Sequence, residues 1–181
     1  MVEVEAKIVL PGCDALAVVE ERLESLGAVL EDSVVEEDTY YQHPCRDFSE
    51  TDEALRIRRV NGRVELTYKG PKRVIQGSKA REEISIGLGD AGAVDELLRV
   101  LGFRPVAVVR KERRYYRLPG AIVSLDRVEG LGCFVEVEYR GPGGVEEAAR
   151  EINRVLEELG LAQYPRTTKS YLELLLSRRS D

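Results

Sequence analysis

Several residue types are scarce in this 181-residue chain, and each scarcity excludes a kind of site. There is no tryptophan, and His43 is the only histidine, so neither a histidine-rich zinc site nor a histidine-based catalytic triad is expected. No apolar run approaches the roughly 20 residues of a membrane-spanning helix, and the N-terminus reads as a charged strand instead of a signal peptide. We therefore expect a cytoplasmic protein with no membrane partner.

Cysteine is also scarce. Cys13, Cys45 and Cys133 are odd in number and far apart, and no two of them form a C-x-x-C motif. This spacing predicts neither a zinc cage nor a disulfide framework, and it fits a reducing compartment. A phosphate-binding P-loop is missing as well: Gly77-Ser78-Lys79 is not one, because the motif G-x-x-x-x-G-K-[ST] is absent. We expect residues 70–80 to form a mobile loop.

What the chain has in abundance is charge of both signs. Charged residues make up 33% of the sequence, with 33 acidic against 27 basic residues and a net charge of -6. A net acidic chain is a poor general nucleic-acid binder, so no nucleic-acid partner is expected. The hydrophobic content of 43% suffices for one folded domain. The many Glu, Lys and Arg residues, with few Asn, Gln and Met, resemble a thermophile composition.

Alternating and β-branched segments predict eight strands, and apolar residues at helical spacing predict four helices. The expected strands are residues 2–10, 34–43, 54–60, 63–69, 80–86, 106–117, 121–128 and 133–140. The expected helices are residues 14–27, 90–102, 145–160 and 168–178. Asn61-Gly62 predicts a tight hairpin turn between two of the strands. This mixture is an α+β pattern.

A weak internal repeat suggests two similar halves. Leu26-Gly27 lies 14 residues before Tyr40-Tyr41, and Leu101-Gly102 lies 14 residues before Tyr115-Tyr116. We interpret residues 1–181 as a single domain with halves of about 1–78 and 79–165, followed by the C-terminal helix. Chance matching of short dipeptides is the alternative.

Charged residues recur at every second position of the expected strands. Glu3, Glu5 and Lys7 share one face of the first strand, since alternate side chains of a strand point the same way. Later strands show the same alternation, in the pairs Arg56/Arg58, Arg81/Glu83, Lys111/Arg113 and Glu136/Glu138 and in Glu65, Lys69 and Asp126. An antiparallel sheet with one solvated face would explain any single strand. So many together indicate a charged lumen inside a curled sheet.

A charged lumen is costly unless ligands neutralise its side chains. Carboxylate oxygens suit hard divalent cations such as Mg²⁺ or Mn²⁺, whereas Arg and Lys suit phosphate. A polyphosphate bound with a divalent cation satisfies both sets of charges.

The ordered motifs resemble those of the CYTH family, the triphosphate tunnel metalloenzymes, which include class IV adenylyl cyclases and thiamine triphosphatases. The matching motifs are Glu3-Val4-Glu5-Ala6-Lys7, Asp38-Thr39-Tyr40-Tyr41, Leu55-Arg56-Ile57-Arg58, Tyr68-Lys69-Gly70-Pro71, Arg81-Glu82-Glu83, Lys111-Glu112-Arg113-Arg114, Asp126-Arg127-Val128, Glu136-Val137-Glu138 and Lys169-Ser170-Tyr171. The resemblance implies an eight-stranded antiparallel closed β-barrel, the triphosphate tunnel, with helices packed outside.

The resemblance also implies roles for individual residues. The implied metal ligands are Glu3, Glu5, Asp126, Glu136 and Glu138, and the implied metal is Mg²⁺ or Mn²⁺. The residues implied to bind the triphosphate are Lys7, Arg56, Arg58, Lys69, Arg81, Lys111, Arg113 and Lys169. The residues expected to act in catalysis are Glu3, Glu5, Lys7 and Asp126.

Three functions remain open at this point. The first is a metal-dependent triphosphatase acting on a nucleoside, thiamine or inorganic triphosphate. The second is a class IV adenylyl cyclase that makes cyclic AMP and pyrophosphate from ATP. The third is a non-catalytic polyphosphate-binding protein. A homodimer is conceivable, but no sequence feature supports it.

Overall fold

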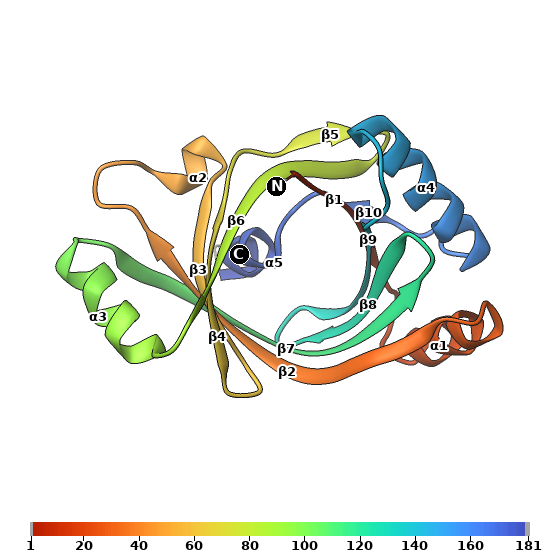
Figure 1. Cartoon of the computed structure of the whole chain (residues 1–181), viewed down its shortest axis with the longest axis horizontal. Helices are drawn as coiled ribbons and strands as arrows, with labels where there is room; N and C mark the ends of the chain where they lie inside the picture. The colour runs from red at the N-terminus through yellow and green to blue at the C-terminus, as the bar shows by residue number, and fades with distance from the viewer. Residues whose placement is uncertain (1, 180–181) are drawn as a thin grey trace.

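The protein folds as a closed antiparallel β-barrel, and the computed structural model describes residues 2–179 (Figure 1). Its eight strands are β1 (Val2–Val9), β2 (Val29–Gln42), β3 (Ala54–Val60), β4 (Arg63–Lys69), β6 (Ser78–Leu88), β7 (Arg104–Leu118), β8 (Ala121–Val128) and β9 (Gly132–Tyr139). They run around the barrel in the order β1-β9-β8-β7-β2-β3-β4-β6. Pairing of β1 with β6, with Glu3 opposite Arg81 and Glu5 opposite Lys79, closes the ring. The predicted eight-stranded closed barrel is confirmed.

The expectation of a mobile loop over residues 70–80 is wrong. A short strand, β5 (Arg73–Ile75), pairs with the start of β6 and forms a hairpin. The turn is Gln76-Gly77, and both residues have positive φ, at 50° and 77°. Two-residue hairpin turns need this backbone conformation, which Asn61-Gly62 also adopts as predicted. Gly and basic residues therefore marked a tight turn here and not a long loop.

Helices cover the outer surface of the barrel, as predicted. On one side α1 (Ala15–Ser25) and α4 (Val145–Glu158) pack on the apolar face of β1, β8 and β9, where Ile152 and Leu156 are fully buried (Figure 1). On the other side α3 (Ala91–Val100) places Leu98 against Tyr41 and Ile57. On β1, β8 and β9 the apolar alternate residues face α1 and α4, so the charged alternate residues of these strands face the lumen.

The order of helix, long strand and hairpin occurs twice along the chain, as α1-β2-β3-β4 and as α3-β7-β8-β9. The two long strands pair with each other from Val29 opposite Arg117 to Gln42 opposite Arg104. Both are longer than predicted. The short elements α2 (Phe48–Thr51) and β10 (Arg166–Thr167) were not predicted.

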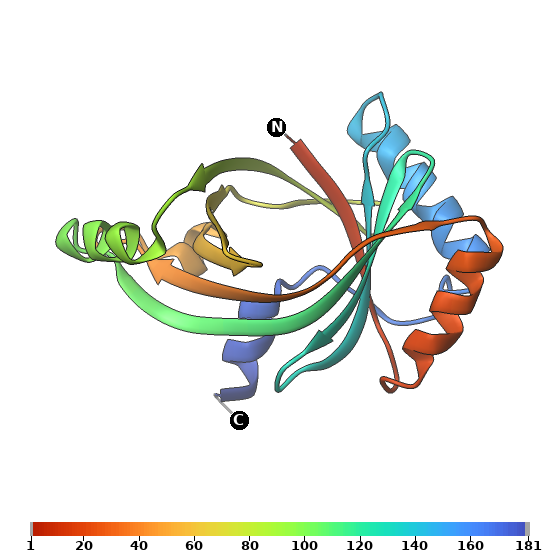
Figure 2. The same cartoon turned by 60° about the horizontal axis from the view of Figure 1, so that its bottom comes forward.

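The last helix, α5 (Tyr171–Arg179), lies across one end of the barrel (Figures 1 and 2). In Figure 2 the start of β1 lies at the top and α5 lies below the strands. The start of β1 therefore lies toward the end of the barrel that α5 does not cover. Within residues 2–179, no helix is long and apolar enough to cross a membrane.

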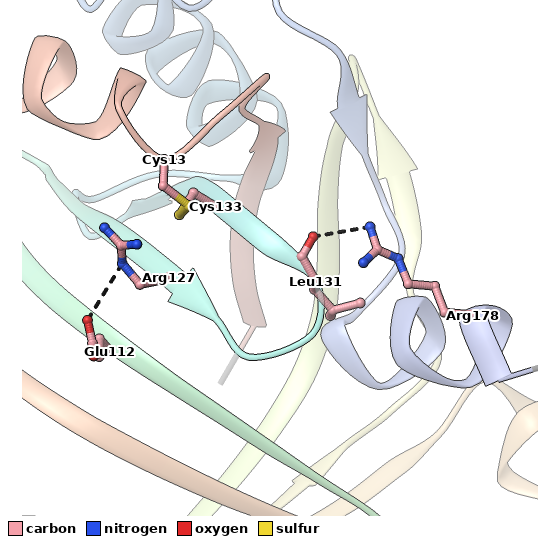
Figure 3. Close-up of a disulfide and its surroundings, with 6 residues drawn as sticks. All are labelled: Cys13, Glu112, Arg127, Leu131, Cys133 and Arg178. Carbon is pink, nitrogen blue, oxygen red and sulfur yellow. Dashed lines mark hydrogen bonds and ion pairs between the residues drawn. A yellow bond between two sulfur atoms is a disulfide. The ribbon is translucent and has the colours of Figure 1, made fainter.

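The expectation of no disulfide is also wrong. Cys13, just before α1, and Cys133, at the start of β9, are joined by a disulfide, with their Cα atoms 5.2 Å apart (Figure 3). Pairing of β1 with β9 brings the two cysteines together, since Val9 lies opposite Phe134 and the Leu10 amide donates to the Cys133 carbonyl. They are 120 residues apart in the chain, so local spacing could not reveal the pair. Cys45 is free and exposed.

Candidate functional site

The lumen of the barrel is a charged cavity of about 250 Å³. All eight barrel strands contribute lining residues, and Ser170 and Tyr171 line it from the end that α5 covers. The structure brings together eleven residues that the sequence analysis placed in the site. They are Glu3, Glu5, Lys7, Arg56, Arg58, Lys69, Arg81, Lys111, Arg113, Glu136 and Glu138.

The charge of the lining is opposite to that of the whole chain. Nine Lys and Arg side chains line the cavity against six Glu side chains, an excess of three positive charges. The whole chain carries a net charge of -6. Three buried acids outside the lining, Glu36, Asp38 and Asp126, pair with Arg58, Lys111 and Arg113. The side chains that face the cavity nevertheless carry the positive excess, which favours an anionic ligand.

On the wall formed by β1, β6 and β9, each lining carboxylate of β1 and β9 is paired with a cation. Lys69 contacts Glu3 at 2.7 Å, Lys7 contacts Glu136 at 3.2 Å, and Lys79 pairs with Glu5. Glu136 also pairs with Arg113, and Arg140 contacts Glu138 at 3.0 Å. Each of these carboxylates is therefore neutralised by a neighbouring Lys or Arg side chain.

Glu138 stands out electrostatically on this wall. It lies directly opposite Glu5 in the β1–β9 pairing, and Glu3 is two residues further along the same face. Burial, followed by the nearby charge of Glu3, raises the pKa of Glu138 to about 7, with Glu5 adding to the effect. A cation between these carboxylates would relieve that accumulation of negative charge.

These residues fit a hard divalent cation in the chemistry of their donors. Carboxylate oxygens are the ligands that Mg²⁺ and Mn²⁺ prefer. Among residues 2–179, no three acidic, His or Cys side chains already converge as a metal cage. Metal binding would therefore require Glu3 and Glu5 to exchange their lysine partners for the ion.

The opposite wall holds a second, deeper ion-pair cluster. Asp38 is fully buried and accepts from Arg58 Nε at 2.7 Å and Arg58 Nη2 at 2.8 Å. Lys111 Nζ lies 2.7 Å from Glu36 Oε2 and 3.2 Å from Asp38 Oδ2, and Arg56 lies 3.3 Å from Asp38. Burial alone would raise the pKa of Asp38, but Lys111, Arg56 and Arg58 hold it well below its usual range. The acids on this wall hold the basic side chains in place.

Two predicted site residues do not reach the cavity with their side chains. Asp126 is fully buried beneath Arg113 and Tyr171, and it accepts from Arg113 and from the Tyr171 hydroxyl. Lys169 has an exposed side chain, and its backbone carbonyl accepts from Lys7 Nζ at 3.1 Å. A role of Asp126 in metal binding and a role of Lys169 in triphosphate binding stay predictions.

The sequence analysis missed several residues of the site. Lys79 was assigned to a loop, although its alternation with Arg81 and Glu83 was a signal that the strand begins earlier. Glu36 continues the alternation of Asp38 and was overlooked in the same way. Further residues that line the cavity without having been assigned to it are Tyr40, Tyr115, Ser124, Arg140 and Tyr171. Tyr171 belongs to the matching motif Lys169-Ser170-Tyr171, but only the docking of α5 shows that its ring lines the cavity.

The chain resembles proteins of one family over nearly its whole length. Residues 1–171 match the family model described as the CYTH domain. A Methanocaldococcus jannaschii protein provisionally named an adenylate cyclase is 38% identical over 176 residues, covering 96% of this chain and 98% of that protein. Adenylate cyclase CyaB of Aeromonas hydrophila is 26% identical over 149 residues, covering 81% of this chain and 74% of that protein.

A solved structure gives the same picture. The PH1819 protein of Pyrococcus horikoshii is 42% identical, with a TM-score of 0.85, and the match covers 98% of this chain and 99% of that one. The fold is therefore shared over nearly the whole length of both chains.

Proposed function

The chain belongs to the CYTH domain family, and from this membership we propose that it is a divalent-metal-dependent enzyme that cleaves a phosphoanhydride bond of a triphosphate substrate. The observation that carries the proposal is the excess of three positive charges on the cavity lining inside a chain of net charge -6. A triphosphate is a compact chain of anionic groups, which matches a narrow lumen lined by Arg and Lys.

Binding would proceed by exchange of partners within the cavity. Glu3, Glu5, Glu136 and Glu138 would hold Mg²⁺ or Mn²⁺, which supplies charge neutralisation at phosphoryl oxygens when bound. Lys7, Lys69 and Lys79 would then be freed from Glu136, Glu3 and Glu5 and could donate to the triphosphate. These ion pairs thus keep the Glu side chains that would hold the metal and the Lys side chains that would bind the triphosphate close to the positions in which they would act.

On the opposite wall, the basic side chains are already oriented. Asp38 holds Arg58 in a two-pronged hydrogen bond and also contacts Arg56. Oriented cations stabilise the charge that develops on phosphoryl oxygens without reorganising during the reaction. In hydrolysis, a water oxygen bonds to phosphorus, the bond to the bridging oxygen breaks with its electron pair, and the water gives up a proton to solvent.

Adenylyl cyclisation is the second candidate. It is favoured by the two relatives of 38% and 26% identity that carry adenylate cyclase names. In this reaction the ribose 3′-oxygen of ATP bonds to the α-phosphorus and loses its proton, while pyrophosphate leaves. The same lining would serve both reactions, and the depth of the triphosphate in the barrel would decide which phosphorus meets its nucleophile. A purely anion-binding protein is less well supported, because binding alone does not need the four carboxylates.

A substrate screen tests the proposal. The protein is incubated with ATP, GTP, thiamine triphosphate or inorganic triphosphate, in Mg²⁺, Mn²⁺ or EDTA, and phosphate, pyrophosphate and cyclic AMP are resolved. We expect metal-dependent release of phosphate from at least one substrate. Cyclic AMP with equimolar pyrophosphate would instead support the cyclase. Identical product levels with metal and with EDTA for every substrate would leave the binding protein as the answer.

Variants test the assignment of the residues. Glu3→Gln with Glu5→Gln should abolish metal-dependent turnover while the protein stays folded, and Arg56→Ala should raise KM sharply. A matched control is Glu21→Gln with Glu24→Gln, since both side chains are exposed on α1. Near-normal turnover by the first variant would refute the metal assignment.

A further inference from the structure

Tyr171 forms the end wall of the cavity. It is the first residue of α5, is only 5% exposed, and lines the cavity together with Ser170. Its ring lies under two ammonium groups from different strands, at 3.8 Å from Lys7 Nζ and 5.7 Å from Lys111 Nζ. The ring edge packs against Phe134, with the centroids 5.1 Å apart. One aromatic ring therefore lies across the lumen where β1, β7 and β9 approach one another.

The hydroxyl of Tyr171 ties this ring to the wall. It donates to Asp126 Oδ2, and Asp126 accepts two further hydrogen bonds from Arg113. Burial, reinforced by the charge of Asp126, raises the pKa of the Tyr171 hydroxyl well above its ordinary value, so it stays a neutral donor. The ring thus has a fixed position relative to Arg113, which lines the cavity.

Helix α5 is anchored at several points, so the ring rests on a firm support. Lys72 contacts Glu173 at 2.9 Å, and Arg178 donates to the carbonyls of Gly130 and Leu131 in the turn before β9 (Figure 3). Leu172, Leu174 and Leu175 pack against the apolar cluster at that end of the barrel.

The face of an aromatic ring attracts cations and repels anions. Lys7 and Lys111 would therefore be held above the ring, whereas a phosphoryl group could not pass it. We propose that Tyr171 is a specificity-determining residue that limits how far the phosphate chain enters the barrel. This inference rests on the proposed function. We infer that a linear polyphosphate stops at the floor formed by Tyr171, so that the phosphates beyond the third lie toward the end of the barrel that α5 does not cover and gain few contacts with the lining.

The depth of entry also has a consequence for the reaction. A substrate that stops at a fixed floor presents a fixed phosphorus to the water or hydroxyl that attacks it. Removing the ring would let the chain slide deeper, past Lys7 and Lys111. Tyr171 therefore sets the balance between phosphate release and cyclisation as well as the chain length.

Binding measurements separate this role from a merely structural one. Affinities for inorganic triphosphate and tetraphosphate are measured by calorimetry in Ca²⁺, a divalent cation that also takes carboxylate oxygens, at low temperature so that turnover is slow. The wild type should bind tetraphosphate no more tightly than triphosphate, despite the larger charge. Tyr171→Ala should shift the ratio of the two affinities toward tetraphosphate by about tenfold or more. Tyr171→Phe, which keeps the ring, should retain the wild-type ratio.

Two further variants control for folding. Tyr171→Leu is a milder truncation and should shift the ratio in the same direction as Tyr171→Ala. Leu175→Ala weakens the packing of α5 without touching the cavity lining and should leave the ratio unchanged. If Tyr171→Ala and Tyr171→Leu lower the affinities for triphosphate and tetraphosphate by the same factor, Tyr171 only supports the fold. That result would refute the proposal that its ring limits how far the phosphate chain enters.

Turnover of ATP with Mg²⁺ or Mn²⁺ provides the second arm. Tyr171→Ala should change the ratio of cyclic AMP to phosphate, while Tyr171→Phe should not. The wild type could bind both polyphosphates with the expected ratio of affinities and yet turn over no triphosphate. In that case the proposed function is wrong, and the proposed role of Tyr171 in limiting entry is still supported. If the wild type binds neither polyphosphate, both proposals fall.

Discussion

Replacing Glu36 by Gln should destabilise the protein in a strongly pH-dependent manner. Glu36 is 1% exposed and contacts Lys111 Nζ at 2.7 Å and Arg58 Nη2 at 2.9 Å. Burial alone would raise the pKa of Glu36, but Lys111, Arg113 and Arg58 lower it from 4.5 to about 2. The glutamine variant removes the charge, as protonation of the carboxylate does.

The size of the effect follows from the pKa. A tenfold change in proton affinity is worth about 1.4 kcal/mol, so the ionised Glu36 contributes roughly 3 kcal/mol to the free energy of unfolding. Because the pKa is lower in the folded state, this contribution is complete above pH 4.5. It is lost as the pH falls from there toward 2.

Urea unfolding of the wild type and Glu36→Gln, followed by circular dichroism at several pH values between 7 and 2, measures the difference. We expect a gap of about 3 kcal/mol at neutral pH that closes progressively below pH 4.5. The control is Glu112→Gln, since that side chain is 71% exposed and lies 3.7 Å from Arg127 (Figure 3). Such an exposed pair is worth less than about 1 kcal/mol.

A gap that is the same at pH 7 and pH 3 would refute the reasoning, because an uncharged packing defect has no pH dependence. A gap below about 1 kcal/mol at neutral pH would show that desolvation of Glu36 cancels its attraction to Lys111 and Arg58.

Three more predictions concern the disulfide, Lys79 in the cavity lining, and the packing of α4 against the barrel. Reduction, or Cys13→Ser with Cys133→Ser, should lower the free energy of unfolding by about 4–5 kcal/mol, because the loop that the disulfide closes is long; unchanged thermal stability in dithiothreitol would contradict this. Lys79→Ala should raise KM for the substrate by about tenfold or more, whereas the exposed Arg154→Ala on α4 should not; equal constants would remove Lys79 from the site. Ile152→Ala, at a fully buried position between α4 and the barrel, should lower the free energy of unfolding in urea by about 3 kcal/mol. A loss below about 1 kcal/mol would mean that the neighbouring side chains repack to fill the cavity.

Period-two alternation made most of the site predictable from the sequence. Once Arg56 and Arg58 are placed on one face of a strand, the buried Ile57 between them must face the helices, and the charges must face the lumen. The same logic located Lys111 with Arg113 and Glu136 with Glu138. Closure of the barrel then needs only that the sheet curl until β1 meets β6.

The failures have one cause in common, which is that they depend on long-range contacts. Lys79 was missed because Gln76-Gly77 looked like a loop, while pairing of β6 with β1 makes its surroundings a strand. Cys13 and Cys133 lie 120 residues apart and meet only through the pairing of β1 with β9.

The sequence by itself therefore determined the eight barrel strands and their inward charges, from which the sign of the proposed ligand follows, because side-chain direction along a strand is a local property. Only the tertiary structure decided which carboxylate pairs with which cation, that Arg113 and Tyr171 cover Asp126, and that Tyr171 closes the lumen. Those features depend on strand register and on the docking of α5, and both arise from contacts between residues far apart in the chain.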